Sequence, residues 1–160
     1  EFDAVPYGTE ALGVMRIEKG HAAGNELNGT TSAQNLGMGR MVSKKKDSIG
    51  SILSERNGLN QDDMLMFVGF KPVDSADRVI AGSHLISKES IANAENDQGY
   101  ITSAAYSPCL GSSIGIGFLK NGDARKSEII RAVSPLTDSD IEMEVVSAHF
   151  IDPKGERLRA

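Results

Sequence analysis

The sequence predicts an α+β fold, in which a helical N-terminal part precedes a small antiparallel β-barrel or sandwich. Apolar residues spaced as on one face of a helix occur over residues 9–19, and a polar, glycine-rich stretch follows them. From residue 64 onward, apolar runs of strand length alternate with turn sequences at the spacing typical of antiparallel sheets. We therefore place a boundary near residue 60, between a helical part (1–60) and a β part (61–160).

The N-terminal part contains one clear helix. Thr9 is expected to cap its start and Gly20 to end it, because threonine hydroxyls accept hydrogen bonds at helix starts and glycine adopts the left-handed conformation of helix ends. The following glycine-rich strap, residues 21–47, has little periodicity and reads as an irregular segment, too polar to form a core element. A second, short helix is predicted over residues 48–57, with Asp47 as its cap.

The β part contains apolar runs separated by turn sequences. Residues 78–87 form either two short strands about Gly82-Ser83 or one bent strand, and the alternating glycines Gly115 and Gly117 indicate close backbone approach or barrel curvature. Residues 88–98 read as a polar loop. The other predicted strands cover residues 64–70, 99–107, 112–119, 125–134 and 140–150, with a hairpin connection at 108–111.

The helical part cannot bury its own apolar faces. Either it packs on the β part, or it is the end of a domain that begins upstream, and we favour the second alternative. The chain starts at Glu1 rather than at a methionine, which indicates a processed or truncated product.

Composition excludes several classes of protein. The net charge is -5 and the basic residues are dispersed, which argues against a nucleic-acid partner. No apolar run approaches the roughly 20 residues of a membrane span, so we expect no membrane association. The single cysteine, Cys109, rules out an internal disulfide and favours a reducing, cytoplasmic location. The one basic cluster, Lys44–Lys46, reads as a solvated turn.

The usual catalytic motifs are weak or missing. The two G-x-G pairs lack the strand-turn-helix context of a dinucleotide site, and no serine lies in a G-x-S-x-G turn. The three histidines lie far apart in sequence without ligand-like spacing, so no metal site is predicted. Cys109 follows a proline in a turn and has no evident base partner. We therefore assign no catalytic residue.

Arg16 and Glu18 are the charges that interrupt the first helix. At about 100° per residue they diverge by roughly 200°, so they cannot pair within the helix, and each must find a partner elsewhere or face water. Arg16 is either a solvated charge at the edge of the helix or a guanidinium held for an anionic ligand, since its planar fork of N–H groups suits a carboxylate. The residue pattern does not choose between these two interpretations.

Three motifs in order resemble the aminomethyltransferase family typified by the glycine-cleavage T-protein. They are GTEALGVMRIEKGHAAGNELNG, LGMGRMVSKKKDSIG and GYITSAAYSPCLGSSIGIGFL. The resemblance covers nearly the whole chain. The residues of the first two motifs are more similar still to the C-terminal regions of the alpha subunits of heterotetrameric sarcosine oxidases. One departure is Ser48, where the family usually has phenylalanine.

The resemblance implies that residues 1–60 are the C-terminal part of a folate-binding domain and that residues 61–160 are the family's C-terminal barrel. Arg16 stands where the family's arginine contacts the anionic part of folate, and Phe150 is the nearest match to an aromatic residue that borders it. Glu18 matches a family acid for which we expect a structural role. Thr102-Ser103 match the barrel signature and are expected to be architectural.

The parent that the resemblance implies oxidises sarcosine to glycine and passes the one-carbon unit to tetrahydrofolate, giving 5,10-methylenetetrahydrofolate. FAD, FMN, NAD and zinc are expected only elsewhere in that complex, and the partners are its other subunits. The family's catalytic aspartate lies upstream of the Arg16 motif, so this chain alone is expected to be inactive. Alternatives are a glycine-cleavage aminomethyltransferase, another folate-dependent demethylase, or a non-catalytic subunit-interface module.

Overall fold

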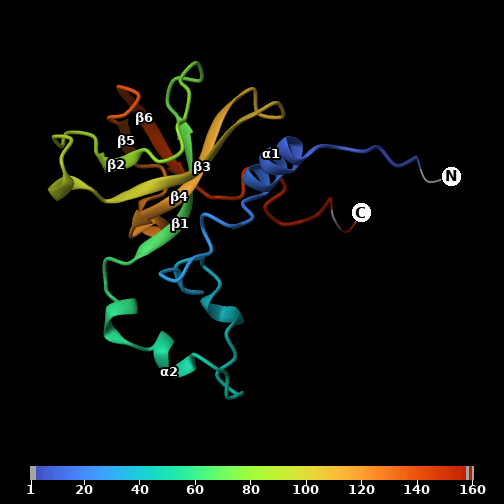
Figure 1. The fold of residues 1–160 in the computed structure, drawn as a ribbon, viewed down its shortest axis with the longest axis vertical. Coiled ribbons are helices and arrows are strands. Elements are labelled where there is room, and N and C mark those ends of the chain that lie inside the picture. The colour runs from blue at the N-terminus through green and yellow to red at the C-terminus, as the bar shows by residue number, and fades with distance from the viewer. Residues whose placement is uncertain (1–2, 158, 160) are drawn as a thin grey trace.

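Antiparallel strands close into a six-stranded barrel in the computed structural model, which describes residues 3–157 and 159 (Figure 1). The order around the barrel is β1-β4-β3-β2-β5-β6, and β1 pairs with both β4 and β6, which closes the sheet. Of the two predicted architectures, the barrel is therefore confirmed. The strands are β1 (Leu65–Pro72), β2 (His84–Ser87), β3 (Gly99–Ser107), β4 (Ser112–Lys120), β5 (Ile129–Ser134) and β6 (Ser139–Val146).

Apolar side chains from every strand fill the barrel interior. On β6, Met143 and Val145 are fully buried and alternate with Glu142 and Glu144, as the predicted period of two requires. Each buried side chain of this size contributes roughly 1.5–3 kcal/mol through removal of apolar surface from water. The interior cluster comprises Val68, Phe70, Val79, Leu85, Ile101, Leu119, Ile130, Ala132, Met143 and Val145.

The β3–β4 hairpin agrees with the prediction, but three other strands are shorter than expected, among them β6, which ends at Val146 rather than at residue 150. Only β2 forms within residues 78–87, because the backbone N–H of Ser83 bonds back to the Ile80 carbonyl in a turn before the strand begins. β5 starts at Ile129 rather than at residue 125, since a 3₁₀ turn, η4 (Gly122–Arg125), occupies the preceding segment. A further 3₁₀ turn, η3 (Ala94–Asn96), lies within the predicted polar loop.

The first helix, α1 (Thr9–Lys19), begins one residue earlier than predicted. Gly8 is the cap, its carbonyl accepts from the Leu12 N–H at 3.1 Å, and no side chain caps the helix, so the assignment of Thr9 as cap is wrong. Gly20 ends the helix in the left-handed conformation (φ 73°), as predicted. The helix packs against the outside of the barrel through Ile17, which contacts a cluster formed with Ile114, Ile116 and Ala148.

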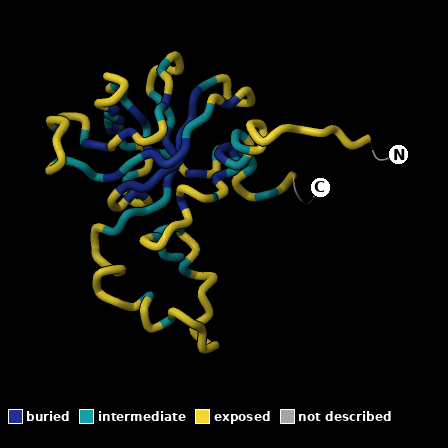
Figure 2. Tube along the Cα trace, viewed as in Figure 1, coloured by how far each residue is buried: buried dark blue, intermediate teal, exposed yellow. Residues whose placement is uncertain are grey.

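The rest of the N-terminal part is mostly exposed and irregular (Figure 2). The predicted helix over residues 48–57 is reduced to α2 (Ser51–Ser54), because Gly50, at φ 90°, has a left-handed backbone that an α-helix cannot continue through. Two 3₁₀ turns flank it, η1 (Gly39–Met41) and η2 (Asn57–Leu59). The Lys44–Lys46 cluster lies in an exposed bend, as predicted.

The strap nevertheless contacts the barrel. The Phe67 backbone N–H donates to the Asn35 carbonyl at 2.7 Å, and the Asn35 side-chain amide donates to the Leu65 carbonyl at 2.6 Å. Of the two alternatives for the helical part, packing on the barrel is thus what the structure shows. That residues 1–60 also end a larger domain remains a prediction.

Candidate functional site

Arg16 lies in the last turn of α1 and points toward the barrel rather than into open solvent. Its Nη1 lies 2.9 Å from Glu26 Oε2, its Nη2 donates to Ser103 Oγ at 2.6 Å, and its side chain is only 21% exposed. A weaker bond of 3.4 Å joins Nη1 to the His21 carbonyl. Of the two alternatives for Arg16, a partner elsewhere or exposure to water, the structure shows the first, while its role toward an anionic ligand stays a prediction.

Glu26 is the partner of Arg16 and is completely buried. Besides Arg16, its Oε2 accepts from the Ala23 backbone N–H at 2.9 Å. Its Oε1 accepts from Thr102 Oγ1 at 2.5 Å and from Ser103 Oγ at 2.8 Å. A carboxylate with four donors has its charge well satisfied, which is the condition under which burial is tolerated. The expectation that the strap is too polar to be buried is therefore wrong at this residue.

A bulge in β3 brings both hydroxyls to Glu26. The pairing with β4 shifts between Ile101 and Ser103, so that Thr102 and Ser103 together oppose one residue of the partner strand. Neighbouring strand residues normally point to opposite faces, and a bulge re-aims one of them. Gly117 permits this geometry, because a Cβ there would lie 2.2 Å from the Tyr100 carbonyl oxygen. The predicted close backbone approach at Gly117 is confirmed.

The electrostatics of Glu26 reflect two opposing effects. Burial by itself raises the pKa of Glu26. The hydrogen bonds from Thr102, the Ala23 N–H and Ser103, together with the Arg16 charge, outweigh burial and hold the pKa below its ordinary value. Glu26 is thus an anion at neutral pH, and the ion pair with Arg16 is charged on both sides.

The guanidinium of Arg16 retains donors beyond its internal partners. Of its five N–H bonds, three are directed at Glu26, His21 and Ser103 within the described part of the chain. Among the described residues, none accepts from the Nε–H or from the second Nη2–H. Because Glu26 and Ser103 are bonded to each other and bind Nη1 and Nη2, they lie at the edge between these two nitrogens, so the second Nη2–H lies on the Nε edge. An Nε–H and Nη2–H side by side can bind a carboxylate through two parallel hydrogen bonds.

Glu18 has the structural role expected of it. Its side chain is buried and accepts a hydrogen bond from the Ser107 hydroxyl of β3. Its backbone carbonyl accepts from both the Phe150 and Ile151 N–H groups at 3.0 Å. The neighbouring Lys19 donates to the Asp152 carbonyl. The end of α1 is thereby joined to β3 and to the segment after β6.

Phe150 lies beside α1, and its backbone N–H donates to the Glu18 carbonyl at 3.0 Å. Its ring is half-buried, packs on the cluster around Ile17, and has the Lys71 ammonium 6.0 Å from its centroid. A Cβ on Gly69 would lie 2.8 Å from the ring, so β1 approaches it closely. The structure therefore places the two predicted site residues next to different strands, Arg16 at β3 and Phe150 at β1.

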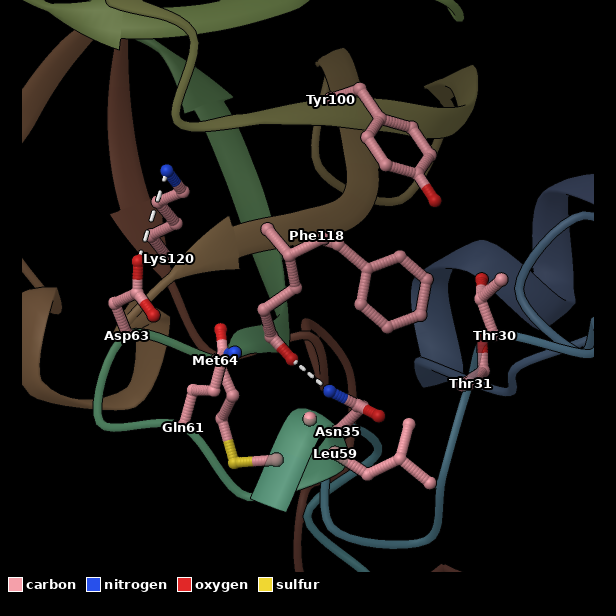
Figure 3. Close-up of a pocket in the computed structure, with 12 residues that line it drawn as sticks. Thr30, Thr31, Asn35, Leu59, Gln61, Asp63, Met64, Tyr100, Phe118 and Lys120 are labelled. Carbon is pink, nitrogen blue, oxygen red and sulfur yellow. Dashed lines mark hydrogen bonds and ion pairs between the residues drawn. The ribbon is translucent and has the colours of Figure 1, made fainter. Parts of the chain in front are cut away.

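A cavity of about 350 Å³ opens between the strap, the segment before β1, and strands β3 and β4 (Figure 3). The rings of Tyr100 and Phe118 border it with centroids 6.0 Å apart, and Lys120 and Asp63 lie 3.9 Å apart at another side. Neither predicted site residue lines this cavity.

The other residues considered in the sequence form no catalytic or metal constellation in the described part of the chain. Cys109 is exposed and free. His84 pairs with Asp97 at 3.2 Å on the surface, and His149 bonds the Lys19 carbonyl at 3.1 Å. Among residues 3–157 and 159, no three histidine, cysteine or acidic side chains cluster as metal ligands would. None of the helices described there has the length and apolar character needed to cross a membrane.

Sequence reasoning missed Glu26 and assigned Thr102 and Ser103 no more than architecture. The pattern did contain one signal, an acid in a segment of small and polar residues shortly after an arginine that lacks a partner in its helix. An ion pair ten residues apart across a helix end has no periodic signature, so spacing alone does not identify it.

The comparisons with known proteins agree with the barrel and with the predicted resemblance. Residues 66–152 match the family model described as glycine cleavage T-protein C-terminal barrel domain. In the crystal structure of glycine cleavage system aminomethyltransferase T from Bartonella henselae, 39% of the chain superposes on 91% of this chain with a TM-score of 0.73 at 20% identity. That likeness confirms the fold.

The curated relatives are longer proteins. Sarcosine oxidase subunit alpha of Rhizobium meliloti (strain 1021) is 42% identical over 155 residues, which are 96% of this chain and 16% of the relative. The namesake subunit of Corynebacterium sp. (strain U-96) is 34% identical over 160 residues, again 16% of its length. The predicted resemblance to sarcosine oxidase alpha subunits is confirmed, over about a sixth of their length. On its fold, its three ordered motifs and the match over residues 66–152, the chain belongs to the family of the glycine cleavage T-protein C-terminal barrel domain.

Proposed function

We propose that this chain is part of a sarcosine oxidase alpha subunit whose enzyme demethylates sarcosine oxidatively to glycine. In the proposed reaction, N5 of tetrahydrofolate would attack the carbon of the imine formed by the oxidation, and N10 would then displace glycine from that carbon, giving 5,10-methylenetetrahydrofolate. The observation that carries this proposal is the 42% identity to a sarcosine oxidase alpha subunit over 96% of the chain. Oxidation itself belongs to flavin groups elsewhere in the complex, and NAD and zinc are likewise assigned to other parts of it.

In this proposal, Arg16 binds the anionic end of tetrahydrofolate. The glutamate tail of folate carries carboxylates, and the unused Nε–H and Nη2–H of Arg16 match a carboxylate in geometry and charge. The side chain is partly shielded at 21% exposure, which strengthens such a contact relative to one in open water. Phe150 would border the ligand by stacking, since its ring has no hydroxyl to donate. The barrel braces this arrangement and contacts neighbouring subunits.

Another candidate is a non-catalytic interface module. It is favoured by the exposed apolar side chains of α1, Leu12 and Met15, and of the segment before it, Val5 and Tyr7. Exposed apolar residues grouped on one segment are typical of surfaces that other chains or domains cover. A glycine-cleavage aminomethyltransferase is the alternative with a different substrate, and the T-protein fold favours it as much as sarcosine oxidase.

Two measurements on the complete polypeptide containing this chain, purified with its co-purifying subunits, test the proposal. Sarcosine is expected to reduce the bound flavin, and calorimetric titration is expected to detect tetrahydrofolate binding. Arg16→Ala should weaken folate binding about tenfold or more while leaving flavin reduction unchanged, because a charge-assisted hydrogen bond contributes roughly 1.5–3 kcal/mol. For Arg16→Lys, which keeps the positive charge but not the planar fork of N–H groups, the affinity for tetrahydrofolate should lie between those of the wild type and Arg16→Ala.

The outcomes separate the candidates. Folate binding without sarcosine-dependent flavin reduction would favour the aminomethyltransferase. Absence of folate binding in the wild-type protein would favour the interface module. An unaltered folate titration in Arg16→Ala would show that Arg16 serves only its internal partners.

A further inference from the structure

The Arg16 guanidinium is held on two sides by one bridged unit. Glu26 Oε2 binds Nη1 directly, and Ser103 Oγ accepts from Nη2 while donating to Glu26 Oε1. The three side chains form a closed ring of hydrogen bonds. Two anchoring points fix the plane of a guanidinium, whereas one would leave it free to rotate. The direction in which the remaining N–H groups point is therefore set by Glu26 and Ser103.

We propose that Glu26 is a positioning residue for Arg16, which it holds both directly and through Ser103. In this role it presents the unused N–H edge of the Arg16 guanidinium to a carboxylate of the ligand. This inference rests on the proposed function, in which that ligand is tetrahydrofolate. Glu26 does not touch the ligand. It gives the guanidinium one orientation before binding, so that the side-chain entropy of ordering Arg16 is not lost when the ligand arrives.

A comparison within the chain distinguishes positioning from simple anchoring. Glu18 is also a buried acid that joins the helical part to a β3 serine, Ser107, and no arginine among the described residues pairs with it. The helix end therefore has an anchor of this kind without an ion pair. Burying an ion pair incurs a large desolvation cost, and well-packed apolar residues would join helix and barrel equally well. The Arg16–Glu26 pair is thus not needed for attachment alone.

The bulge in β3 supports the same assignment. Glu26 reaches two consecutive hydroxyls only because the pairing shifts between Ile101 and Ser103, and Gly117 is the residue that makes room for the shift. Bulges are enriched where a strand must re-aim a side chain. Here the re-aimed hydroxyl contacts both partners of the ion pair.

The experiment compares two ligands on the complete protein with its co-purifying subunits. Tetrahydrofolate carries the glutamate tail, and 6-methyltetrahydropterin has the same reduced ring without any carboxylate. The dissociation constant of tetrahydrofolate is measured by calorimetry and that of the pterin by competition. The variants are Glu26→Gln, which keeps the shape and removes the charge, and Glu18→Gln as the matched control. Ser103→Ala and Ser103→Thr form a second pair, in which only threonine restores the hydroxyl.

Glu26→Gln is expected to raise the dissociation constant of tetrahydrofolate about tenfold, because the glutamate tail binds Arg16. The dissociation constant of the pterin, which has no tail, should stay within about twofold of the wild-type value. Glu18→Gln should leave the dissociation constants of both ligands unchanged. Ser103→Ala should weaken tetrahydrofolate selectively, and Ser103→Thr should recover most of the loss, which keeps the test open if Glu26→Gln does not fold. Equal losses for both ligands, or no loss for either, would overturn the positioning role. If the wild-type protein binds neither ligand, the proposed function itself fails.

Discussion

Arg16 and Glu26 form an ion pair, 2.9 Å from Nη1 to Oε2, in which the acid is completely buried and the base keeps a fifth of its surface exposed. The asymmetry is informative. The carboxylate of Glu26 accepts hydrogen bonds from groups of the strap and of β3, so its contacts lie within the protein interior. Among the described residues, the guanidinium of Arg16 is bound only through Nη1 and one Nη2–H, so its Nε edge is available to a partner.

Stability should depend on pH through Glu26. Its folded-state pKa is lowered, so the unfolded chain takes up the proton first as pH falls. The contribution of Glu26 is thus complete above about pH 4.5, the ordinary value, and is lost as pH falls through the lower folded-state pKa. Thermal melting of the chain between about pH 7 and pH 3 should show this loss.

Glu26→Gln isolates that contribution. The variant should be less stable than wild type by about 2 kcal/mol at neutral pH. Its stability should also fall less than that of wild type when the pH is lowered, because it has no carboxylate at this position to protonate. Asp140→Asn is the control, because the pKa of Asp140 is also lowered, by a hydrogen bond from Arg131, but at an exposed pair. Parallel pH profiles for wild type and Glu26→Gln would contradict the assignment.

Gly117→Ala should destabilise the barrel by about 3 kcal/mol, because the added Cβ would meet backbone atoms of Tyr100, Ile101 and Thr102 that cannot move without disrupting the bulge. Gly13→Ala is the counterpart with the opposite sign. It lies within α1 with open space around its Cβ position and should stabilise the helix by about 0.5–1 kcal/mol. Denaturant melts of both variants give the comparison. Equal stability of Gly117→Ala and wild type would show that the bulge tolerates a side chain.

Ile17→Ala should detach α1 from the barrel more than it weakens the barrel itself. Ile17 is the buried apolar residue of the helix, and its truncation should cost roughly 2–5 kcal/mol at that contact. Hydrogen exchange is expected to accelerate in α1 and in the segment around Phe150 while β3 and β4 remain protected. Met15→Ala, on the exposed face, should leave exchange unchanged. Uniform acceleration across the barrel would indicate a single cooperative unit instead.

The 160-residue chain by itself should neither oxidise sarcosine nor transfer a one-carbon unit. The described residues contain no metal-like cluster, and the hydroxyls of Thr102 and Ser103 next to Arg16 donate to a buried carboxylate that already has four donors. Assays with sarcosine and tetrahydrofolate, using the complete enzyme as positive control, check this expectation. Turnover by the purified chain above the rate of a buffer blank would overturn it.

Much of the barrel followed from local pattern. The alternation of Met143 and Val145 with acids, and the Pro108-to-Gly111 turn between two apolar runs, each correspond to a feature that a few neighbouring residues determine. Gly20 likewise ended α1 because its left-handed conformation is a local property. The errors also had local causes. Gly50, in a left-handed conformation, shortened the second helix, and a turn at Ile80–Ser83 removed one strand.

The candidate site could be predicted only in part. Arg16 was found through resemblance, and its lack of a partner within the helix followed from helical geometry. The identity of that partner could not follow, because Glu26 meets Arg16 only after the strap has folded back and β3 has formed its bulge. A register shift of this kind depends on contacts between distant strands and leaves little trace in either strand alone.

The joining of Glu18 and Lys19 to the segment at Phe150–Asp152 has a consequence for biosynthesis. These bonds connect residues more than 130 positions apart, so a chain emerging from the ribosome makes α1 early but cannot secure its end until β6 and the residues after it have been translated. Throughout that interval the apolar face of α1, which includes Ile17, lacks some of its native contacts and stays exposed. A chaperone that shields short apolar segments would have its longest opportunity there.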